Sequence, residues 1–287
     1  MLTRRRFAAL SAAAAGTALV APRRLSAATH SGLAFGVQIY MVRDLLGPTD
    51  LPVTLRLIHQ IGYASIETYP LVYNRPAKEL KSLIEGQGLK APSGHFDYET
   101  LDERVDYAAE LGLEYMICPM LPQPLWDSLD GFHRAAAHLN KAAAKARAAG
   151  LNFGYHPHNY EFKKLGNGRG FDVLMRELDP SVKLELDVYW AVEAGEIPLE
   201  LMSKHRDRLA LLHIKDRKPA AGVTFSPFDK QAAHFTKAGS GVIDWKATLG
   251  EAHRLGVKQY FVDQDGYDIP VEESLRRNWK YLSRLSL

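Results

Sequence analysis

Short apolar runs alternate with longer amphipathic segments along most of this chain. Residues 209–212 are four consecutive apolar residues that follow Arg208 and precede a polar segment beginning at His213. An uninterrupted apolar run indicates a strand buried on both faces, as in a parallel sheet covered by helices, and we predict a strand over 209–216. Seven further strands are predicted at 35–40, 63–67, 89–95, 113–118, 151–155, 182–187 and 258–262.

Helices are predicted between these strands, most clearly at 51–61, 132–149 and 272–285. Strands that alternate with helices form a parallel sheet, and residues 29–287 match the roughly 250 residues of an eight-unit barrel. We therefore predict an α/β fold, a single (β/α)8 TIM barrel, as the one domain over residues 29–287. Five glycines follow helix-like segments and precede apolar runs, as helix C-caps do: Gly62, Gly88, Gly112, Gly150 and Gly256.

The first 28 residues predict a signal peptide and are set apart from the fold. Residues 3–7 read Thr-Arg-Arg-Arg-Phe, an uncharged alanine-rich run follows over 8–20, and small residues end the segment at Ala28. This composition is typical of a secretory signal, and the paired arginines indicate twin-arginine export. The apolar run is too short to span a bilayer. We expect cleavage after Ala28, a periplasmic or exported protein and no stable membrane insertion; the alternative is a retained anchor or a disordered tail.

Setting this segment aside changes the charge of the protein. The whole chain has 36 basic and 33 acidic side chains, and five of the arginines lie in residues 1–28, so the rest carries a net charge of about −2. Nucleic-acid binding requires a basic surface, so we expect no nucleic-acid partner. Cys118 is the only cysteine, which excludes an intramolecular disulfide. The sequence leaves open whether the chain forms a homo-oligomer.

Polar side chains are concentrated where the predicted strands end. The carboxyl ends of the strands form the active-site floor of a TIM barrel. Candidate substrate-binding residues are Gln38 on the first strand, Glu67 at the end of the second, Trp190 after the sixth and Gln264 after the eighth. Glu67 has the alternative role of capping the next turn. The long connection over 217–243 is predicted to be a lid or a partner surface.

The fifth strand ends in the sequence His156-Pro157-His158-Asn159-Tyr160-Glu161. Period-two alternation places His156 and His158 on the same side, and Pro157 ends the strand ladder. Two imidazoles and a carboxylate so close together indicate a metal-ligand or acid–base cluster, with surface histidines as the alternative. The candidate catalytic residues are His156, His158, Glu161, Lys215 and, at the end of the third strand, His95.

Three more ligand-type side chains, Asp187, His213 and Asp263, end the sixth, seventh and eighth strands. Adjacent strand ends converge in a closed barrel, so these residues and His156 could surround one divalent ion and leave positions open for substrate oxygens. Nitrogen and oxygen ligands without sulfur suit Mn, Mg, Co or Zn. We predict one divalent metal ion; for His213 the alternative is a hydrogen-bonded core histidine.

The chain resembles the xylose-isomerase-like sugar isomerase and epimerase superfamily over residues 29–287. The resemblance is carried by residues 36–40 with 43–44, 155–158 with 161–162, 184–190, 213–216, 239–245 and 262–265. It implies a divalent metal held by a carboxylate on strand five, an aspartate on strand six, a histidine on strand seven and a glutamate on strand eight. His156 and Asp263 depart from this pattern, which puts proton transfer by a pair of glutamates in doubt. His156, His158 or His95 would then serve as the base.

The predicted function is that of a metal-dependent isomerase or epimerase that removes a proton alpha to the carbonyl of a sugar or keto-sugar. The metal would stabilise the enediolate, and Lys215 could neutralise the developing oxyanion. Expulsion of a beta substituent would give lyase chemistry, and the superfamily includes 3-keto-glycoside lyases. A noncatalytic periplasmic sugar-binding barrel is a further alternative, because the two expected glutamates are replaced. In every case the expected partner is a small-molecule sugar.

Overall fold

The computed structural model describes residues 29–47, 50–229 and 234–287. The predicted twin-arginine signal peptide, residues 1–28, lies outside the described residues. Eight strands lie at the positions predicted from the apolar runs, with ends shifted by one to a few residues: β1 (Gly36–Gln38), β2 (Ser65–Thr68), β3 (Lys90–His95), β4 (Tyr115–Cys118), β5 (Asn152–Tyr155), β8 (Lys183–Asp187), β9 (Leu209–Ile214) and β12 (Gln259–Val262).

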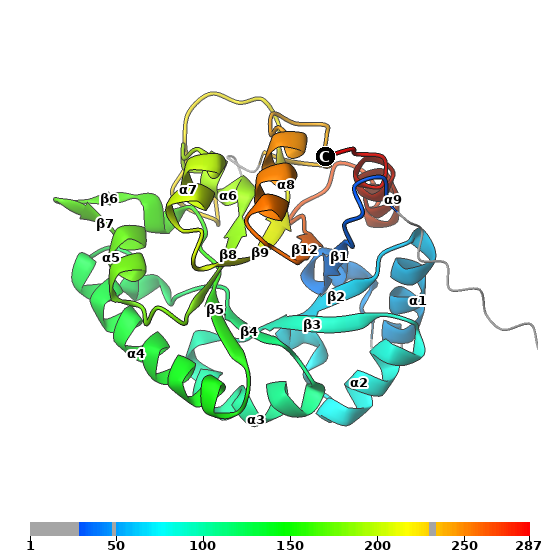
Figure 1. Ribbon diagram of the computed structural model, residues 1–287, viewed down its shortest axis with the longest axis horizontal. Helices are drawn as coiled ribbons and strands as arrows, with labels where there is room; N and C mark the ends of the chain where they lie inside the picture. The colour runs from blue at the N-terminus through cyan, green and yellow to red at the C-terminus, as the bar shows by residue number, and fades with distance from the viewer. Residues whose placement is uncertain (1–28, 48–49, 230–233) are drawn as a thin grey trace, which may run out of the picture.

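These strands form a closed barrel in the order β1-β12-β9-β8-β5-β4-β3-β2, and neighbouring strands run parallel. Helices surround the barrel on the outside (Figure 1). They are α1 (Leu51–Ile61), α2 (Ala77–Gly86), α3 (Leu101–Leu111), α4 (Leu129–Ala148), α5 (Gly170–Glu177), α6 (Val188–Glu193), α7 (Pro198–Lys204), α8 (Trp245–Arg254) and α9 (Val271–Leu282). The prediction of a (β/α)8 TIM barrel is confirmed.

Short elements fill the loops between these strands and helices. The first strand ends at Gln38 instead of Tyr40, because Oε1 of Gln38 accepts a 3.0 Å hydrogen bond from the Tyr40 backbone N–H and the chain turns into a 3-10 helix. The short elements are η1 (Ile39–Leu45), η2 (Pro70–Val72), η3 (Tyr98–Thr100), η4 (Gln123–Leu125), η5 (Tyr160–Phe162) and the hairpin strands β6 (Lys164–Leu165), β7 (Gly168–Arg169), β10 (Asp216–Arg217) and β11 (Phe235–Thr236).

The five glycines predicted as helix C-caps all have positive φ, between 80° and 126°. At Gly62, which follows α1, a Cβ atom would also lie 2.5 Å from the ring of Trp279. Backbone conformation and packing against α9 therefore both require glycine at this position.

The interior of the barrel changes from apolar to polar along the strands. Ile117, Leu211 and Phe261 form a small buried cluster of their own. By period-two alternation, Leu211 shares its face with His213, and Phe261 shares its face with Asp263. Apolar side chains thus fill the lower part of the interior, and the chemically active groups follow at the carboxyl ends of the same strands.

The segment 217–243, predicted as a lid or a partner surface, contains β11 and is fixed near both of its ends. At one end Nε of Arg217 donates a 2.7 Å hydrogen bond to the buried Glu193 on α6. At the other end the backbone N–H groups of Gly239 and Gly241 donate to the carboxylate of Asp216. Among the described residues, no helix combines the length and the apolar character that a membrane span would require.

Candidate metal centre

A cavity of about 780 Å³ opens at the carboxyl ends of the barrel strands. Seven residues that the sequence predicted for the site line this cavity: Gln38, His95, His156, His158, Trp190, Lys215 and Asp263. Asp187 and His213 are fully buried beside them. Residues from six barrel strands or the loops that follow them therefore converge at one place, as the order of strand ends predicts.

Asp187, His213 and Asp263 offer ligand atoms that all lie within 4.8 Å of one another. Nδ1 of His213 is 3.8 Å from Oδ2 of Asp187 and 3.7 Å from Oδ2 of Asp263. Nε2 of His156 lies 3.8 Å from the same Asp187 oxygen. Divalent ions such as zinc hold nitrogen and oxygen ligands at about 2.1 Å, which separates ligand atoms by roughly 3 to 4 Å. Asp187, His213 and Asp263 therefore fit a single divalent cation, and His156 lies near enough to one of their oxygens to be a fourth candidate ligand.

The hydrogen bonding of this group also fits a cation. Oδ2 of Asp187, Nδ1 of His213 and Oδ1 of Asp263 are buried and have no hydrogen-bond partner among the described residues. A buried polar atom without a hydrogen bond is costly, and three of them on neighbouring side chains require an explanation. Oδ2 of Asp187 has a charged neighbour, the ammonium of Lys215 at 3.1 Å. A cation bound between these side chains would give Nδ1 of His213 a partner and would compensate the buried charge of the two aspartates.

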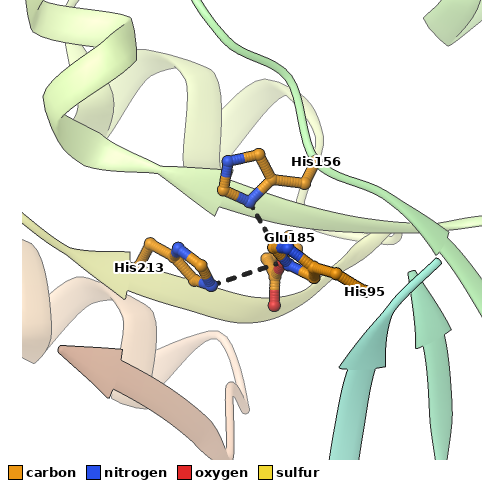
Figure 2. A group of neighbouring side chains, drawn as sticks. All are labelled: His95, His156, Glu185 and His213. Atoms are coloured by element: carbon orange, nitrogen blue, oxygen red, sulfur yellow. Dashed lines mark hydrogen bonds and ion pairs between the residues drawn. The ribbon is translucent and has the colours of Figure 1, made fainter. Parts of the chain in front are cut away.

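A second layer of polar side chains lies next to the candidate ligands, on the side of the barrel interior. In this layer the imidazoles of His95, His156 and His213 are arranged around Glu185 (Figure 2). Oε2 of Glu185 is 2.8 Å from Nε2 of His95 and 3.0 Å from Nδ1 of His156. Oε2 of Glu67 is 2.7 Å from Nε2 of His213. These carboxylates accept the N–H groups of His156 and His213, which leaves Nε2 of His156 and Nδ1 of His213 as lone pairs for a metal.

His95, His156, Glu185 and His213 also offer ligand atoms that lie within 4.8 Å of one another. Oε2 of Glu185 is already hydrogen-bonded to His95 and His156, and only its Oε1 lacks a hydrogen bond among the described residues. In the group of Asp187, His213 and Asp263, each side chain has an atom without one. The second layer is therefore best described as the set of residues that orients the candidate ligands.

Burial and neighbouring charges give the histidines different protonation states. Burial lowers the pKa of His156 and of His158 well below the usual value, so both imidazoles are neutral near pH 7. Burial would also lower the pKa of His95, but the carboxylates of Glu67 and Glu185 raise it to about 9. His158 can therefore accept a proton, while His95 already carries one.

The two carboxylates of the second layer remain ionised. Burial alone would raise the pKa of Glu67, but His95 and His213 hold it well below its usual value. In Glu185, burial and the charge of Glu67 raise the pKa, and the charge of His213 together with hydrogen bonds from His156 and His213 brings it down to about 2. The layer is thus a set of charge-assisted hydrogen bonds in the barrel interior.

Five predicted site residues do not line the cavity: Asp187 and His213, which are buried beside it, and Glu161, Glu67 and Gln264. Glu161, expected to be catalytic, accepts hydrogen bonds from Tyr155 Oη at 2.6 Å and from the His158 backbone N–H at 3.0 Å. It therefore positions the turn that carries His158. Glu67, expected to bind substrate, is fully buried and does not reach the cavity. Its carboxylate accepts the hydrogen bond from Nε2 of His213 and so orients that imidazole.

Gln264 is also displaced from its expected role. Its Oε1 accepts a 2.8 Å hydrogen bond from Oγ of Ser274 on α9, and its Nε2 donates to the backbone oxygen of Gly266. The alternation of side chains after β12 turns Asp263 and Asp265 inward and directs Gln264 to the helices. Gln264 therefore faces α9 and not the cavity.

Two groups of residues were not singled out from the sequence. Glu185 and Asp265 each lie two positions from a predicted ligand, so period-two alternation was the signal that could have identified them. The aromatic residues Trp126, Phe228 and Phe235 line the outer cavity. Trp126 directly follows η4, and the two phenylalanines belong to the 217–243 segment, where no periodic pattern relates them to the strands.

A closed (β/α)8 barrel with a candidate divalent-metal centre at its strand ends defines the general class of this protein. Residues 55–277 match the xylose isomerase-like TIM barrel family, and the chain belongs to that family. The resemblance noted from the strand-end motifs is therefore confirmed at the level of the family.

Relatives by sequence include two inosose dehydratases. The one from Geobacillus thermodenitrificans (strain NG80-2) is 27% identical over 233 residues, which are 66% of this chain and 74% of that protein. The one from Lacticaseibacillus casei is 32% identical over 151 residues, which are 48% of this chain and 45% of that protein.

Solved structures of the same fold include a sugar phosphate isomerase/epimerase from Parabacteroides distasonis ATCC 8503. It is 25% identical, with 87% of this chain and 97% of that chain covered and a TM-score of 0.74. The IOLI protein with a bound zinc atom is similar in fold alone, at 14% identity and a TM-score of 0.67, with 86% and 96% covered. The family and these relatives identify the chain as an enzyme of the sugar isomerase/epimerase-like kind.

Proposed function

We propose that this enzyme removes a proton alpha to the carbonyl of a keto-sugar or keto-cyclitol and then expels a beta hydroxyl as water. The observation that carries the proposal is the group of ligand atoms that Asp187, His213 and Asp263 hold within 4.8 Å of one another, beside the neutral His158. The inosose dehydratase relatives support elimination over isomerisation or epimerisation, which would begin with the same proton transfer.

The residues proposed to hold the divalent ion are Asp187, His213, Asp263 and His156. When bound there, a divalent cation supplies Lewis-acid polarisation of a substrate carbonyl, a contribution of several kcal/mol to transition-state stabilisation. Manganese, magnesium, cobalt and zinc all suit this ligand set.

His158 is the proposed base. It lines the cavity, its ring centroid is 5.3 Å from that of Trp190, and its buried Nδ1 has no hydrogen-bond partner among the described residues. The imidazole takes the proton from the alpha carbon, and the electron pair of that C–H bond forms the enediolate. When the bond from the beta carbon to its hydroxyl breaks, the imidazolium returns the proton to the leaving hydroxyl, and water is the product.

Other residues would bind and shield the substrate. Lys215 lines the cavity two residues after His213 and carries a positive charge that can stabilise a developing oxyanion. Gln38 and Trp190 line the cavity, where an amide can hydrogen-bond a sugar hydroxyl and an indole can stack on a sugar ring. Segment 217–243 contributes Phe228 and Phe235, which exclude water from one side.

The test is a panel of inososes, ketohexoses and 3-keto-glucosides incubated in deuterated water with metal-free protein and with protein supplied with Mn²⁺, Co²⁺ or Zn²⁺. We expect loss of water from at least one keto compound, with both elimination and alpha-proton exchange dependent on metal. Deuterium in an unchanged or epimerised sugar without water loss would assign an isomerase or epimerase. Neither exchange nor elimination with any metal would refute the proposal.

A 3-keto-glycoside lyase is the second candidate, and the width of the cavity favours it. The volume of about 780 Å³ lies in the upper part of the range of roughly 300 to 1,000 Å³ typical of ligand pockets. Trp126 and Phe228 lie at its outer side, with ring centroids 5.7 Å apart and planes inclined by 15°. Such rings can stack on a flat group attached to the sugar.

The two candidates differ in their use of Trp126. If the substrate is a glycoside, Trp126→Ala lowers kcat/KM for an aryl 3-keto-glucoside at least tenfold and leaves the value for the free keto-sugar unchanged. Equal loss for both compounds would assign Trp126 a structural role and remove the support for a glycoside substrate.

Export by the twin-arginine route is a further part of the proposal, supported by the sequence of residues 1–28. A fusion of this segment to a reporter that matures only after export should be active in the periplasm. Replacing Arg5 and Arg6 by lysine should retain the reporter in the cytoplasm, whereas unchanged export would refute the twin-arginine assignment.

A further inference from the structure

The ammonium of Lys215 is held by three carboxylates at the candidate metal centre. Nζ lies 3.1 Å from Oδ2 of Asp187, 2.6 Å from Oδ2 of Asp263 and 2.5 Å from Oδ2 of Asp265. The Lys215 side chain is buried, so solvent does little to screen these contacts. The ammonium is therefore already a cation bound to the acidic groups of the site.

Two of these three oxygens are also the oxygens that face Nδ1 of His213. Oδ2 of Asp187 and Oδ2 of Asp263 lie 3.8 Å and 3.7 Å from that nitrogen. Lys215 thus occupies the same carboxylate oxygens that complete the candidate ligand set. Two cations that share ligands at such short range repel each other strongly in a buried site.

The third carboxylate offers the ammonium an alternative position. Asp265 belongs to the loop after β12, and its side chain is 27% exposed, whereas Asp187 is fully buried. Nζ also lies 5.3 Å from the ring centroid of Trp190 and 5.9 Å from that of Phe235. A carboxylate and aromatic faces together suit an ammonium that has withdrawn from the other two aspartates.

We propose that Lys215 and a divalent cation compete for the Oδ2 atoms of Asp187 and Asp263, and that Asp265 holds the ammonium when the cation is bound. The inference rests on the proposed metal centre. In the metal-free protein Lys215 neutralises the buried aspartates, and metal binding moves its ammonium toward Asp265. Lys215 therefore limits the affinity for metal, and Asp265 raises that affinity without being a ligand.

Calorimetric titration of metal-free full-length protein with Mn²⁺, and separately with Zn²⁺, tests the inference without reference to activity. Lys215→Met keeps the length of the side chain and removes its charge, so the metal Kd should fall at least about tenfold. Asp265→Asn should raise the Kd at least about tenfold, because the ammonium loses its alternative partner. In the Lys215→Met background, Asp265→Asn should change the Kd by less than about twofold, since no ammonium remains to be held.

Lys237 is the matched control. It is also buried and is paired with an aspartate, Asp268, at 2.8 Å, but it does not line the cavity. Lys237→Met should leave the metal Kd unchanged. Circular dichroism of each variant shows whether it is folded. For Lys215→Met, a rise of the melting temperature toward the wild-type value when metal is added shows that the folded variant binds the metal.

The outcomes separate the inference from the proposed function. If no folded variant and no wild-type preparation binds metal, the metal centre itself is refuted. If wild type binds metal and Lys215→Met binds it equally or more weakly, the competition is refuted while the centre stands. If Asp265→Asn weakens binding equally with and without Lys215, Asp265 is a ligand and its proposed role is overturned.

Discussion

Nε2 of His213 donates a 2.7 Å hydrogen bond to Oε2 of Glu67, although 146 positions separate the two residues in the chain. The bond crosses the interior of the barrel, because β2 and β9 are not neighbouring strands. It fixes the protonated nitrogen of His213 on the side away from Asp187 and Asp263. Glu67 therefore decides which nitrogen of His213 is available to a metal.

Glu67→Gln should weaken metal binding. The amide keeps the size of the side chain but loses the charge that orients His213, and loss of such a partner typically reduces metal affinity roughly 10- to 100-fold. Calorimetric titration of the metal-free variant measures the effect. Ser93→Ala removes the hydroxyl that donates a 2.6 Å hydrogen bond to Oε1 of Glu67 and retains the carboxylate, so it should cause a smaller loss. Wild-type affinity in Glu67→Gln would contradict the orienting role.

Asp187→Asn and Asp187→Ala should both abolish measurable metal binding, because each removes a carboxylate ligand. They should differ in stability. Oδ1 of Asp187 accepts a 3.0 Å hydrogen bond from the Trp190 backbone N–H and caps α6. Asparagine retains a cap and alanine does not, so urea unfolding of the metal-free proteins should show Asp187→Ala to be less stable than Asp187→Asn by about 1 kcal/mol. Metal binding retained in both variants would exclude Asp187 as a ligand.

His158→Gln should separate catalysis from metal binding. Loss of a general base typically costs roughly 10²- to 10⁴-fold in rate, while His158 is not among the proposed ligands. Deuterium exchange by the metal-loaded variant should fall by such a factor, and its metal Kd should remain within about twofold of wild type. His253→Gln, on an exposed part of α8, is the control and should leave both values unchanged. Unchanged exchange in His158→Gln would move the base to another residue.

Glu161→Gln should alter the pH dependence of stability. Burial raises the pKa of Glu161 to about 7, against the ordinary 4.5, even though hydrogen bonds from Tyr155 and from the His158 backbone oppose the shift. The folded protein therefore retains a proton that the unfolded chain releases between pH 4.5 and 7, so this group's contribution to stability is lost as pH rises through that window.

The variant carries no such proton. Compared with wild type, Glu161→Gln should gain relative stability between pH 5 and 8, by at most about 3 kcal/mol at 1.36 kcal/mol per pKa unit. Urea unfolding of both proteins at these two pH values measures the difference. If the difference in unfolding free energy between variant and wild type is the same at both pH values, the pKa of Glu161 is not raised by burial and this prediction is wrong.

Much of the site was predictable because a TIM barrel places the carboxyl ends of all its strands at one end. The apolar runs located the strands, and the residues that follow them, such as Asp187, His213 and Asp263, were expected to meet. The same reasoning fails where alternation turns a side chain outward. Gln264 lies between two inward-facing aspartates and contacts α9 instead of the cavity.

The sequence by itself determined the barrel, the positions of its strands and the kinds of ligand at their ends, because apolar runs, helix patterns and C-cap glycines are local signals. Only the tertiary structure decided which atoms of those ligands face one another. The carboxylates that fix the imidazole nitrogens of His156 and His213 come from Glu185 and Glu67 on other strands. Such contacts depend on strand order, register and rotamer in the closed barrel, and no local pattern of residues encodes them.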